Sequence, residues 1–526
     1  MDELNSNWDL QEDDNIKDSY VAVSTSEIDT AAQLMAEGTV EIDPVKVARV
    51  RNKIDWHILP LMCTLYWIQF MDKTTLGSAA ILGIRYVQLG TLSRAVVLGT
   101  IFYLSYLLFE YPQNLALQRF PVGRWMSINI FIWGIALCAH AACNNFTGLF
   151  LVRSILGACE GSITAGFMIV SSMFYTRNEQ TLRVGYWFLM NGTAQIISGF
   201  ISFGTLHIKT EGFEPWQWCL PHCRLMSITG VLTLITAVAF WSVLLFPDSP
   251  TNAWFLTREE RTIAVRRLKE NQTGVENKHF KIEQFNEALR DPKTWLFALF
   301  SALNNVPNSL TNQNQIIVAS FGFTYLQTTL LGCVDGIIEI VTIFTGVHLA
   351  TRLRDARAYV GALYFIPNLI GVLLLNVLPW SNRIGLLCAN WLTGVGTTGF
   401  VLSLSWLSNV TAGHTKRVTV NAIMLIAYCI GNAAGPFMWQ ERFRPRNRVP
   451  WTIIGLCYLT CPILMLAIRR RLAAENAQRD RELPDETYDS VYVKVAGTDG
   501  SPVKRKIDKE FLDMTDIQNR DFRYVL

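Results

Sequence analysis

TREERTIAVRRLKENQTG, residues 257–274, is a densely charged stretch in the middle of a chain that is otherwise dominated by long apolar runs. It lies within a polar segment, 248–292, with six such runs before it and six after it. Each run has roughly 20 residues, enough for a helix to cross the hydrocarbon core of a bilayer. The sequence therefore predicts an all-α polytopic membrane protein, with 12 transmembrane helices arranged as two six-helix bundles.

The predicted spans follow from these runs. The first six are 57–81, 95–117, 125–144, 148–174, 184–206 and 225–246, and the second six are 294–318, 326–350, 358–378, 383–408, 416–439 and 450–470. The predicted domains are an acidic N-terminal tail with the composition of a disordered segment (1–55), a first bundle (56–247), the central loop (248–292), a second bundle (293–471) and a C-terminal tail (472–526).

The composition agrees with a membrane protein. Of the 526 residues, 50% are hydrophobic and only 17% are charged, whereas soluble proteins have about 25% charged residues. The net charge of +3 is a sum over acidic and basic segments of the chain, so it does not indicate which class of partner the protein binds. Residues 1–43 are acidic, unlike the basic start of a secretory signal peptide, so we expect the first span to remain as an uncleaved anchor.

The distribution of Lys and Arg predicts the orientation. Basic residues precede the first span, follow the last one and are frequent in the central loop, which places both termini and this loop in the cytoplasm. One loop disagrees, because WQERFRPRNRVP (439–450) is expected outside and carries four arginines. We expect a multi-pass protein of the plasma membrane that acts as a monomer and binds no nucleic acid.

Four charged residues lie inside the first and fourth predicted spans. Asp72 and Lys73 are adjacent in the first span, and Arg153 and Glu160 are seven residues apart in the fourth, nearly two helical turns and hence on one face. Charges in hydrocarbon are costly and mark transport paths, so we expect these four around a water-accessible cavity, where a carboxylate can bind and release protons. Alternatively, they form a static ion-pair network that holds the two helices together.

Other polar residues extend this prediction. Asp335 and Glu339 are four residues apart in the eighth span and should share a face, which makes both possible additional titratable groups. Pro307 should break the seventh helix, as is common where transporters line a cavity. The amides predicted to reach a bound ligand are Asn191, Gln195, Asn304, Asn308 and Asn421; each alone is more often a contact between helices.

The chain shows no convincing metal or cofactor site. Cys219, His222 and Cys223 are three candidate ligands in one short loop, which is weak evidence for a metal; a plain loop is the favoured interpretation, ahead of a disulfide. GVGTTG (394–399) spells a dinucleotide fingerprint, but it lies in a predicted span without a preceding strand, and we interpret it as small-residue helix packing. We find no nucleophile–base pair and no phosphate loop, and therefore predict neither an enzyme nor a cofactor.

Several motifs resemble the fungal allantoate permease family, which belongs to the anion:cation symporter branch of the major facilitator superfamily. They are FMDKTTLGSAAILG (70–83), HAACNNFTGL (140–149), DPKTW (291–295), GHTKR (413–417) and GNAAGP (431–436), and the resemblance covers roughly 45–472. It implies symport of protons with a small organic anion, such as a vitamin or a ureide. By this similarity Asp72 and Glu160 would carry protons, Lys73 would contact the substrate, and Arg153 would link the two.

The chain departs from the family pattern in places. Thr75 stands where the family usually has Asn, and the acidic residue of the usual gating motif is missing from LALQRFPVGR (115–124) and replaced by Thr351 in the second half. Two other functions remain open from the sequence: an exporter of a secondary metabolite with the same fold, or a nutrient sensor that does not transport.

Overall fold

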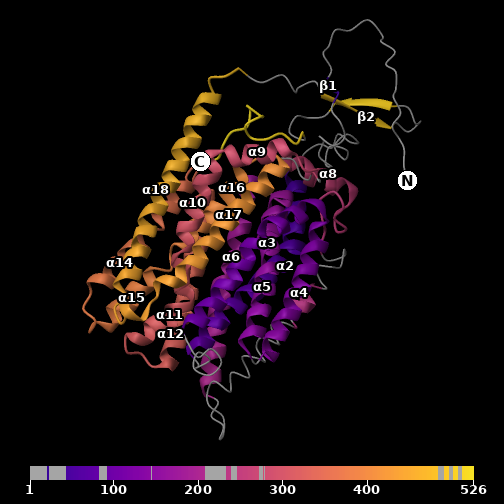
Figure 1. The fold of residues 1–526 in the computed structure, drawn as a ribbon. Helices are drawn as coiled ribbons and strands as arrows, with labels where there is room; N and C mark the ends of the chain where they lie inside the picture. The colour runs from indigo at the N-terminus through magenta and orange to yellow at the C-terminus, as the bar shows by residue number, and fades with distance from the viewer. Residues whose placement is uncertain are drawn as a thin grey trace.

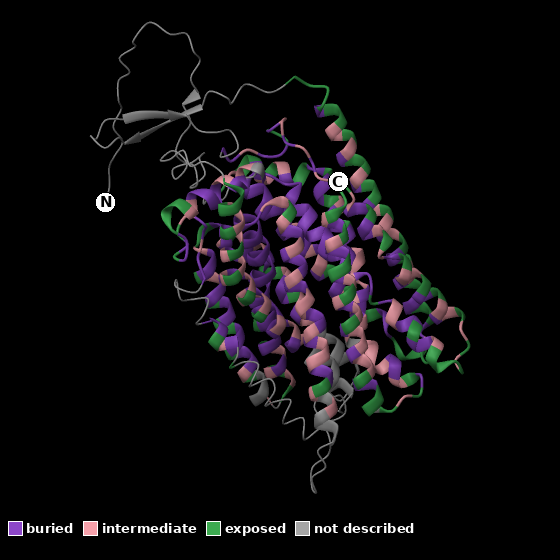
Figure 2. Cartoon of the chain, turned by 180° about the vertical axis from the view of Figure 1, so that it is seen from behind, coloured by how far each residue is buried: buried purple, intermediate pink, exposed green. Residues whose placement is uncertain are grey.

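The structure is a computed structural model that describes residues 21–22, 43–81, 92–143, 145–207, 231, 233–237, 246–271, 277, 279–483, 491–496, 502–506 and 512–526. Long helices run side by side in it, with the helices of the first half of the chain on one side and those of the second half on the other (Figure 1). Figure 2 shows buried residues concentrated between the helices.

The helices before the central segment are α2 (Pro44–Ile81), α3 (Leu92–Arg119), α4 (Val122–Ala142), α5 (Phe146–Phe174) and α6 (Arg177–His207). The central segment contains α8 (Arg258–Arg267), η3 (Leu268–Asn271) and α9 (Ile282–Arg290). The helices after it are α10 (Pro292–Asn305), η4 (Pro307–Ser309), α11 (Leu310–Ser320), α12 (Tyr325–Arg352), α13 (Arg357–Leu363), α14 (Ile366–Val377), α15 (Arg383–Leu392), α16 (Thr397–Asn409), α17 (His414–Ala434), η5 (Gly435–Met438), η6 (Glu441–Phe443) and α18 (Arg448–Arg479).

A small sheet lies apart from the helices (Figure 1). The strand β1 (Val21–Ala22) pairs in parallel with β2 (Val491–Ala496), and β2 pairs antiparallel with β3 (Pro502–Lys506). The register aligns Val21 with Val491 and Val493 with Arg505.

Described helical segments lie over eleven of the twelve predicted spans. The sixth span, 225–246, falls mostly outside the described residues, so the count of twelve stays a prediction. Seven helical stretches of the described chain are long and apolar enough to cross a membrane. The predicted domain boundaries at 55 and 471 fall inside α2 and α18, because both helices extend beyond their apolar spans.

Some predicted spans are interrupted. The seventh is broken at Pro307, as predicted, where the 3₁₀ turn η4 separates α10 from α11. The tenth is broken within GVGTTG, because α15 ends at Leu392 and α16 begins at Thr397. Gly396 and Gly399 of this motif pack closely, with Asn368 and Phe365 filling the spaces where a Cβ would lie.

The two halves meet closely along α6 and α12. Gly185, Gly192 and Gly199 recur every seven residues on one face of α6. A Cβ added to Gly192 would lie 2.4 Å from the carbonyl oxygen of Gly336 on α12, and the reverse distance is 2.5 Å. We call this backbone contact the glycine seam.

One end of the helix bundle, here called the tail end, carries α8, α9 and residues 512–526 (Figure 1). Polar contacts join the two halves there. Gln118 Nε2 on α3 donates to Thr415 Oγ1 on α17 at 3.0 Å, and Arg417 Nη1 donates to Ser172 Oγ at 3.2 Å. Arg177 Nη1 donates to the carbonyl oxygen of Arg523 at 3.2 Å. The tail end is therefore closed in this structure.

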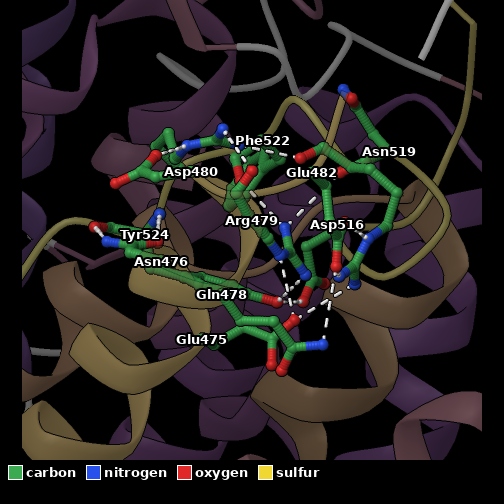
Figure 3. Close-up of polar contacts among 12 residues, drawn as sticks. Glu475, Asn476, Gln478, Arg479, Asp480, Glu482, Asp516, Asn519, Phe522 and Tyr524 are labelled. Carbon is green, nitrogen blue, oxygen red and sulfur yellow. Dashed lines mark hydrogen bonds and ion pairs between the residues drawn. The ribbon is translucent and has the colours of Figure 1, made fainter. Parts of the chain in front are cut away.

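Residues 512–526 pack against this closed end. Asp516 is fully buried and accepts from Lys293 Nζ and from Tyr524 Oη, both at 2.7 Å, while Lys416 Nζ lies 2.9 Å from its other oxygen. Arg479 at the end of α18 donates to the carbonyl oxygen of Phe522 at 2.8 Å and to Tyr524 Oη at 3.0 Å (Figure 3). This segment, which we call the docked tail, adds a buried polar layer that the sequence did not reveal.

Candidate functional site

A cavity of about 220 Å³ lies between the two halves near the middle of the helices. It extends away from the tail end, since its lining includes Ser198 and Gly199 late in α6 and Thr329 early in α12. The residues that line the cavity come from both halves of the chain, as expected for two six-helix bundles.

Lys73 and Glu160 meet at the wall of this cavity. They form an ion pair, and Gln69, one turn before Lys73 on α2, donates from Nε2 to Glu160 Oε1 at 2.6 Å. The Glu160 side chain is only 1% exposed, whereas that of Lys73 is 22% exposed. The ammonium group is thus the accessible partner, and it lies 5.9 Å from the centroid of the Phe102 ring.

Asp72 and Arg153 lie behind the cavity wall. Both are buried and neither lines the cavity. They attract each other electrostatically without an ion pair closer than 4 Å, and Asp72 Oδ1 and Arg153 Nη2 have no hydrogen-bond partner among the described residues.

The packing of α3 on α5 explains why Arg153 is covered. At Gly157, between Arg153 and Glu160, the helices approach so closely that an added Cβ would lie 2.1 Å from the carbonyl oxygen of Phe102. At Gly161, too, the missing side chain leaves room for α3, whose Glu110 Oε2 would lie 2.9 Å from an added Cβ. Because α3 covers this part of α5, only Lys73 and Glu160 of the four predicted charges lie at the cavity, and Asp72 and Arg153 stay behind its wall.

The acidic pair of α12 does face the cavity. Glu339 accepts from Gln195 Nε2 of α6, and Asp335 Oδ2 accepts from Asn314 Nδ2 at 2.5 Å. The prediction that Asp335 and Glu339 share one face is confirmed. Asn390 Nδ2 in turn donates to Asn314 Oδ1 at 2.5 Å, so the carboxylate ends a chain of amides.

The predicted amides divide into two groups. Asn191, Gln195, Asn304 and Asn308 line the cavity, together with Pro307. Asn421 does not line it, because this residue lies only two turns from the start of α17 at the closed tail end, where it is buried.

Sequence reasoning missed several lining residues. They include the amides Gln69, Asn314, Gln315 and Asn390 and the aromatic residues Tyr66, Phe70, Tyr106, Phe188, Phe400, Tyr428 and Tyr458. The Phe400 and Tyr428 rings stack with centroids 5.7 Å apart. Aromatic residues are frequent throughout the apolar spans, so the sequence pattern gave no signal that singled these out.

Metal binding finds no support in the described part of the chain, where no group of three or more His, Cys, Asp or Glu side chains could hold a metal ion. Cys219, His222 and Cys223 lie outside the described residues.

Comparisons with known proteins place this geometry in a family. Residues 62–436 match the model of the Major Facilitator Superfamily. The chain is 34% identical over 490 residues to the thiamine pathway transporter of Saccharomyces cerevisiae, covering 93% of this chain and 87% of that protein. It is 29% identical to the allantoate permease of the same yeast, covering 95% of this chain and 91% of the permease.

Solved structures show the same fold. The proton:xylose symporter XylE from E. coli aligns with a TM-score of 0.59 at 13% identity, over 78% of this chain and 94% of the symporter. The human organic anion transporter MFSD10 aligns with a TM-score of 0.54 at 11% identity, over 78% of this chain and 99% of that chain. This chain belongs to the Major Facilitator Superfamily, whose members are membrane transporters rather than enzymes, and its relatives include the yeast allantoate permease.

Proposed function

We propose that this protein is a secondary active transporter that couples protons to the symport of a small organic anion by alternating access. The substrate class is a carboxylate such as a vitamin, a ureide or a related nutrient. The observation that carries this proposal is the Lys73–Glu160 ion pair at the cavity wall, in which the cation is accessible and the carboxylate is buried.

This pair makes proton binding and anion binding depend on each other. While Glu160 is ionised, it is paired with the Lys73 ammonium group, which is the group that an incoming carboxylate would bind. Protonation of Glu160 removes that competitor, and the free Lys73 then attracts the anion through a charge-assisted hydrogen bond. A bound anion in turn stabilises the cation that the neutral Glu160 no longer pairs.

The remaining contacts come from amides of both halves. Gln195 and Asn191 on α6, with Asn304 and Asn308 near the break at η4, offer donors and acceptors to the rest of the ligand. Differences at such positions would allow related transporters to carry different compounds. The names of the relatives point to this range, since they include an allantoate permease and a high affinity cysteine transporter.

Asp72 and Arg153 have a separate proposed role. Asp72 Oδ1 and Arg153 Nη2 have no hydrogen-bond partner among the described residues, so both atoms can form a further hydrogen bond directly behind Lys73. We assign Asp72 as a second proton carrier and Arg153 as the link between Asp72 and Glu160. Arg153 and Asn421 are not among the substrate contacts that we propose for this closed-tail-end conformation.

The proposed setting follows the charge distribution. The tail end would face the cytoplasm, because the basic residues near the ends of the spans concentrate on that side. The two sets of helices would act as the predicted bundles, moving against each other in a monomer in the plasma membrane. The cavity, which extends away from the tail end, would then receive substrate from outside.

The test is uptake into yeast that lacks its own permeases. Cells expressing the full chain receive radiolabelled allantoate, cysteine or nicotinate at acidic and at neutral external pH, with and without a protonophore. Acid-stimulated, protonophore-sensitive accumulation of one compound is expected. Uptake that ignores both pH and the protonophore would refute proton coupling. No uptake of any compound by protein shown at the cell surface would favour an exporter or a sensor.

The matched variant is Lys73→Met, which keeps an unbranched side chain one atom shorter but removes its charge. We expect the apparent affinity for the anion to fall about tenfold or more, because hydrogen bonds to charged groups contribute about 1.5–3 kcal/mol. Lys73→Arg keeps the charge and should retain part of the affinity.

A further inference from the structure

A buried carboxyl group outside the cavity has no role so far. Glu110 on α3 is 0% exposed. Its Oε1 accepts from Asn114 Nδ2 at 2.6 Å, and its Oε2 has no hydrogen-bond partner among the described residues. No Lys, Arg or His of the described chain forms an ion pair with it.

Glu110 belongs to a file of buried polar residues along α3. Tyr106, Glu110, Asn114 and Gln118 follow one another every four residues, and each is at most 2% exposed. Residues at this spacing are neighbours on a helix surface. Tyr106 lines the cavity, and Gln118 contacts Thr415 at the closed tail end, so the file leads from the cavity to the tail end.

The neighbouring helices leave room for this carboxyl group. A Cβ added to Gly161 of α5, the residue after Glu160, would lie 2.9 Å from Glu110 Oε2. On α17, Cys429 lies within electrostatic range of Glu110, as does Tyr106 on α3 itself. The groups placed near Glu110 are therefore an amide, a phenol and a thiol, and none of them is a cation; Glu160 directly precedes Gly161 on α5.

A carboxylate in such a site would be very costly. An ionised group removed from water without a cation is avoided in proteins, and it binds a proton instead. Glu110 therefore holds a proton while the tail end is closed. Opening of the tail end separates Gln118 from Thr415 and admits water to Asn114 and Glu110, which then can ionise.

We propose that Glu110 is a further proton-binding residue of the transport cycle and that the α3 file is the path by which the proton leaves. When the tail end opens, Glu110 releases its proton to water on that side. The proton on Glu160 then passes to the Glu110 carboxylate, with the Tyr106 hydroxyl as the intermediate group between them. Glu160 is then ionised again and re-forms its ion pair with Lys73. This ion pair displaces the bound anion. One proton enters from the cavity and one leaves at the tail end.

This inference rests on the proposed proton coupling, so its first test needs no substrate. The full chain is purified, reconstituted in lipid nanodiscs and compared with Glu110→Gln by infrared spectroscopy. The introduced glutamine can still accept from Asn114 Nδ2 but cannot bind a proton. The C=O stretching band of protonated carboxyl groups should be weaker in the variant. Equal bands would mean that Glu110 is ionised and would overturn the proposal.

The second test measures transport of the radiolabelled compound that the native chain accumulates most strongly among allantoate, cysteine and nicotinate. Glu110→Gln should lower the accumulation ratio to about one, yet still exchange internal for external label, because exchange needs no net proton movement. Accumulation equal to that of the native chain would overturn the proposal. Loss of both processes with normal surface expression would also overturn it, since the residue would then be needed for anion binding or closure.

Cys429→Ser is the matched control, because it alters a neighbour of Glu110 without removing an ionisable carboxyl group. It should keep both the infrared band and accumulation. If the native chain shows no pH-dependent accumulation of any of these compounds, the proposed symport fails. The infrared comparison still decides whether Glu110 binds a proton.

Discussion

Two groups of buried charges differ sharply in how completely they are bonded. At the tail end, Lys416 Nζ lies within 3.1 Å of carboxylate oxygens of Glu287, Asp291 and Asp516. Lys293 Nζ donates to Asp516 and to the carbonyl oxygen of Val410, both at 2.7 Å. Every ammonium group in this cluster therefore has several acceptors.

The charges near the cavity are bonded far less completely. Lys73 and Glu160 form a pair, but polar atoms of Asp72 and Arg153 behind them lack partners among the described residues. A fully bonded buried network favours one arrangement of the chain, whereas buried polar atoms without partners are costly and leave bonding capacity for a proton or a ligand. This difference is what we expect if the tail-end cluster stabilises the structure and the charges near the cavity carry the proposed transport chemistry.

The largest expected effect comes from Glu160→Gln. It leaves Lys73 without a carboxylate and removes the proton-binding group, so proton-driven accumulation should be lost in the uptake assay. The introduced glutamine can keep a hydrogen bond with Gln69, and the cavity solvates the freed ammonium group, so the protein should fold. Normal accumulation by this variant would show that the cavity cluster is as static as the one at the tail end.

Asp516→Asn should instead act on stability. Two buried lysines would lose their shared carboxylate, and breaking a buried ion pair in this way costs about 3–5 kcal/mol. Thermal unfolding in detergent measures the loss. The control is Asp480→Asn, whose exposed ion pair with Arg523 should contribute at most about 1 kcal/mol. Equal melting temperatures for the two variants would contradict a stabilising role of the docked tail.

A third variant separates the glycine seam from both clusters. Gly192→Ala places a methyl group 2.4 Å from the carbonyl oxygen of Gly336, so α6 and α12 must move apart, at a cost of about 1–3 kcal/mol. Uptake should fall although every charge is retained. Gly332→Ala is the control for folding, because an added Cβ there meets no heavy atom within 4 Å. Unchanged uptake in Gly192→Ala would show that the seam tolerates separation.

The smallest expected effect is the response of the tail-end cluster to mild acid. Burial would raise the pKa of Asp516, but Lys293 and Lys416 lower it, and the result lies below the usual range. A lowered pKa means that the stabilisation is complete above the unfolded value of about 3.9 and is lost only as pH falls through the folded value. The difference in melting temperature between the native chain and Asp516→Asn should therefore be equal at pH 7 and at pH 5. A smaller difference at pH 5 would contradict this assignment.

Apolar runs and local spacing were enough to predict much of the fold. They located the helices, the break at Pro307 and the shared face of Asp335 and Glu339, because these features depend on neighbours along one helix. They also brought Lys73 and Glu160 forward as candidates, since charges inside apolar runs are conspicuous.

The rest depends on contacts between helices. The position of Arg153 behind the wall follows from the approach of α3 at Gly157, which a single helical pattern does not reveal. Glu110 was overlooked, although it lies inside the second predicted span, because no second charge in that span singles it out and its partner is the amide of Asn114. The docked tail brings Asp516 onto Lys293, more than 200 residues away in the sequence, and no local pattern predicts such a pairing.

The glycine seam has a consequence for the path of the proposed transport cycle. Backbone meets backbone at Gly192 and Gly336, and Val347 and Cys333 of α12 fill the spaces beside Gly185 and Gly199, so α6 and α12 cannot come closer there. Reorientation of the two halves would therefore have to pivot about this contact and break the hydrogen bonds at the tail end, among them Gln118–Thr415 and Arg417–Ser172. We expect variants that weaken these hydrogen bonds to change the rate of the proposed cycle.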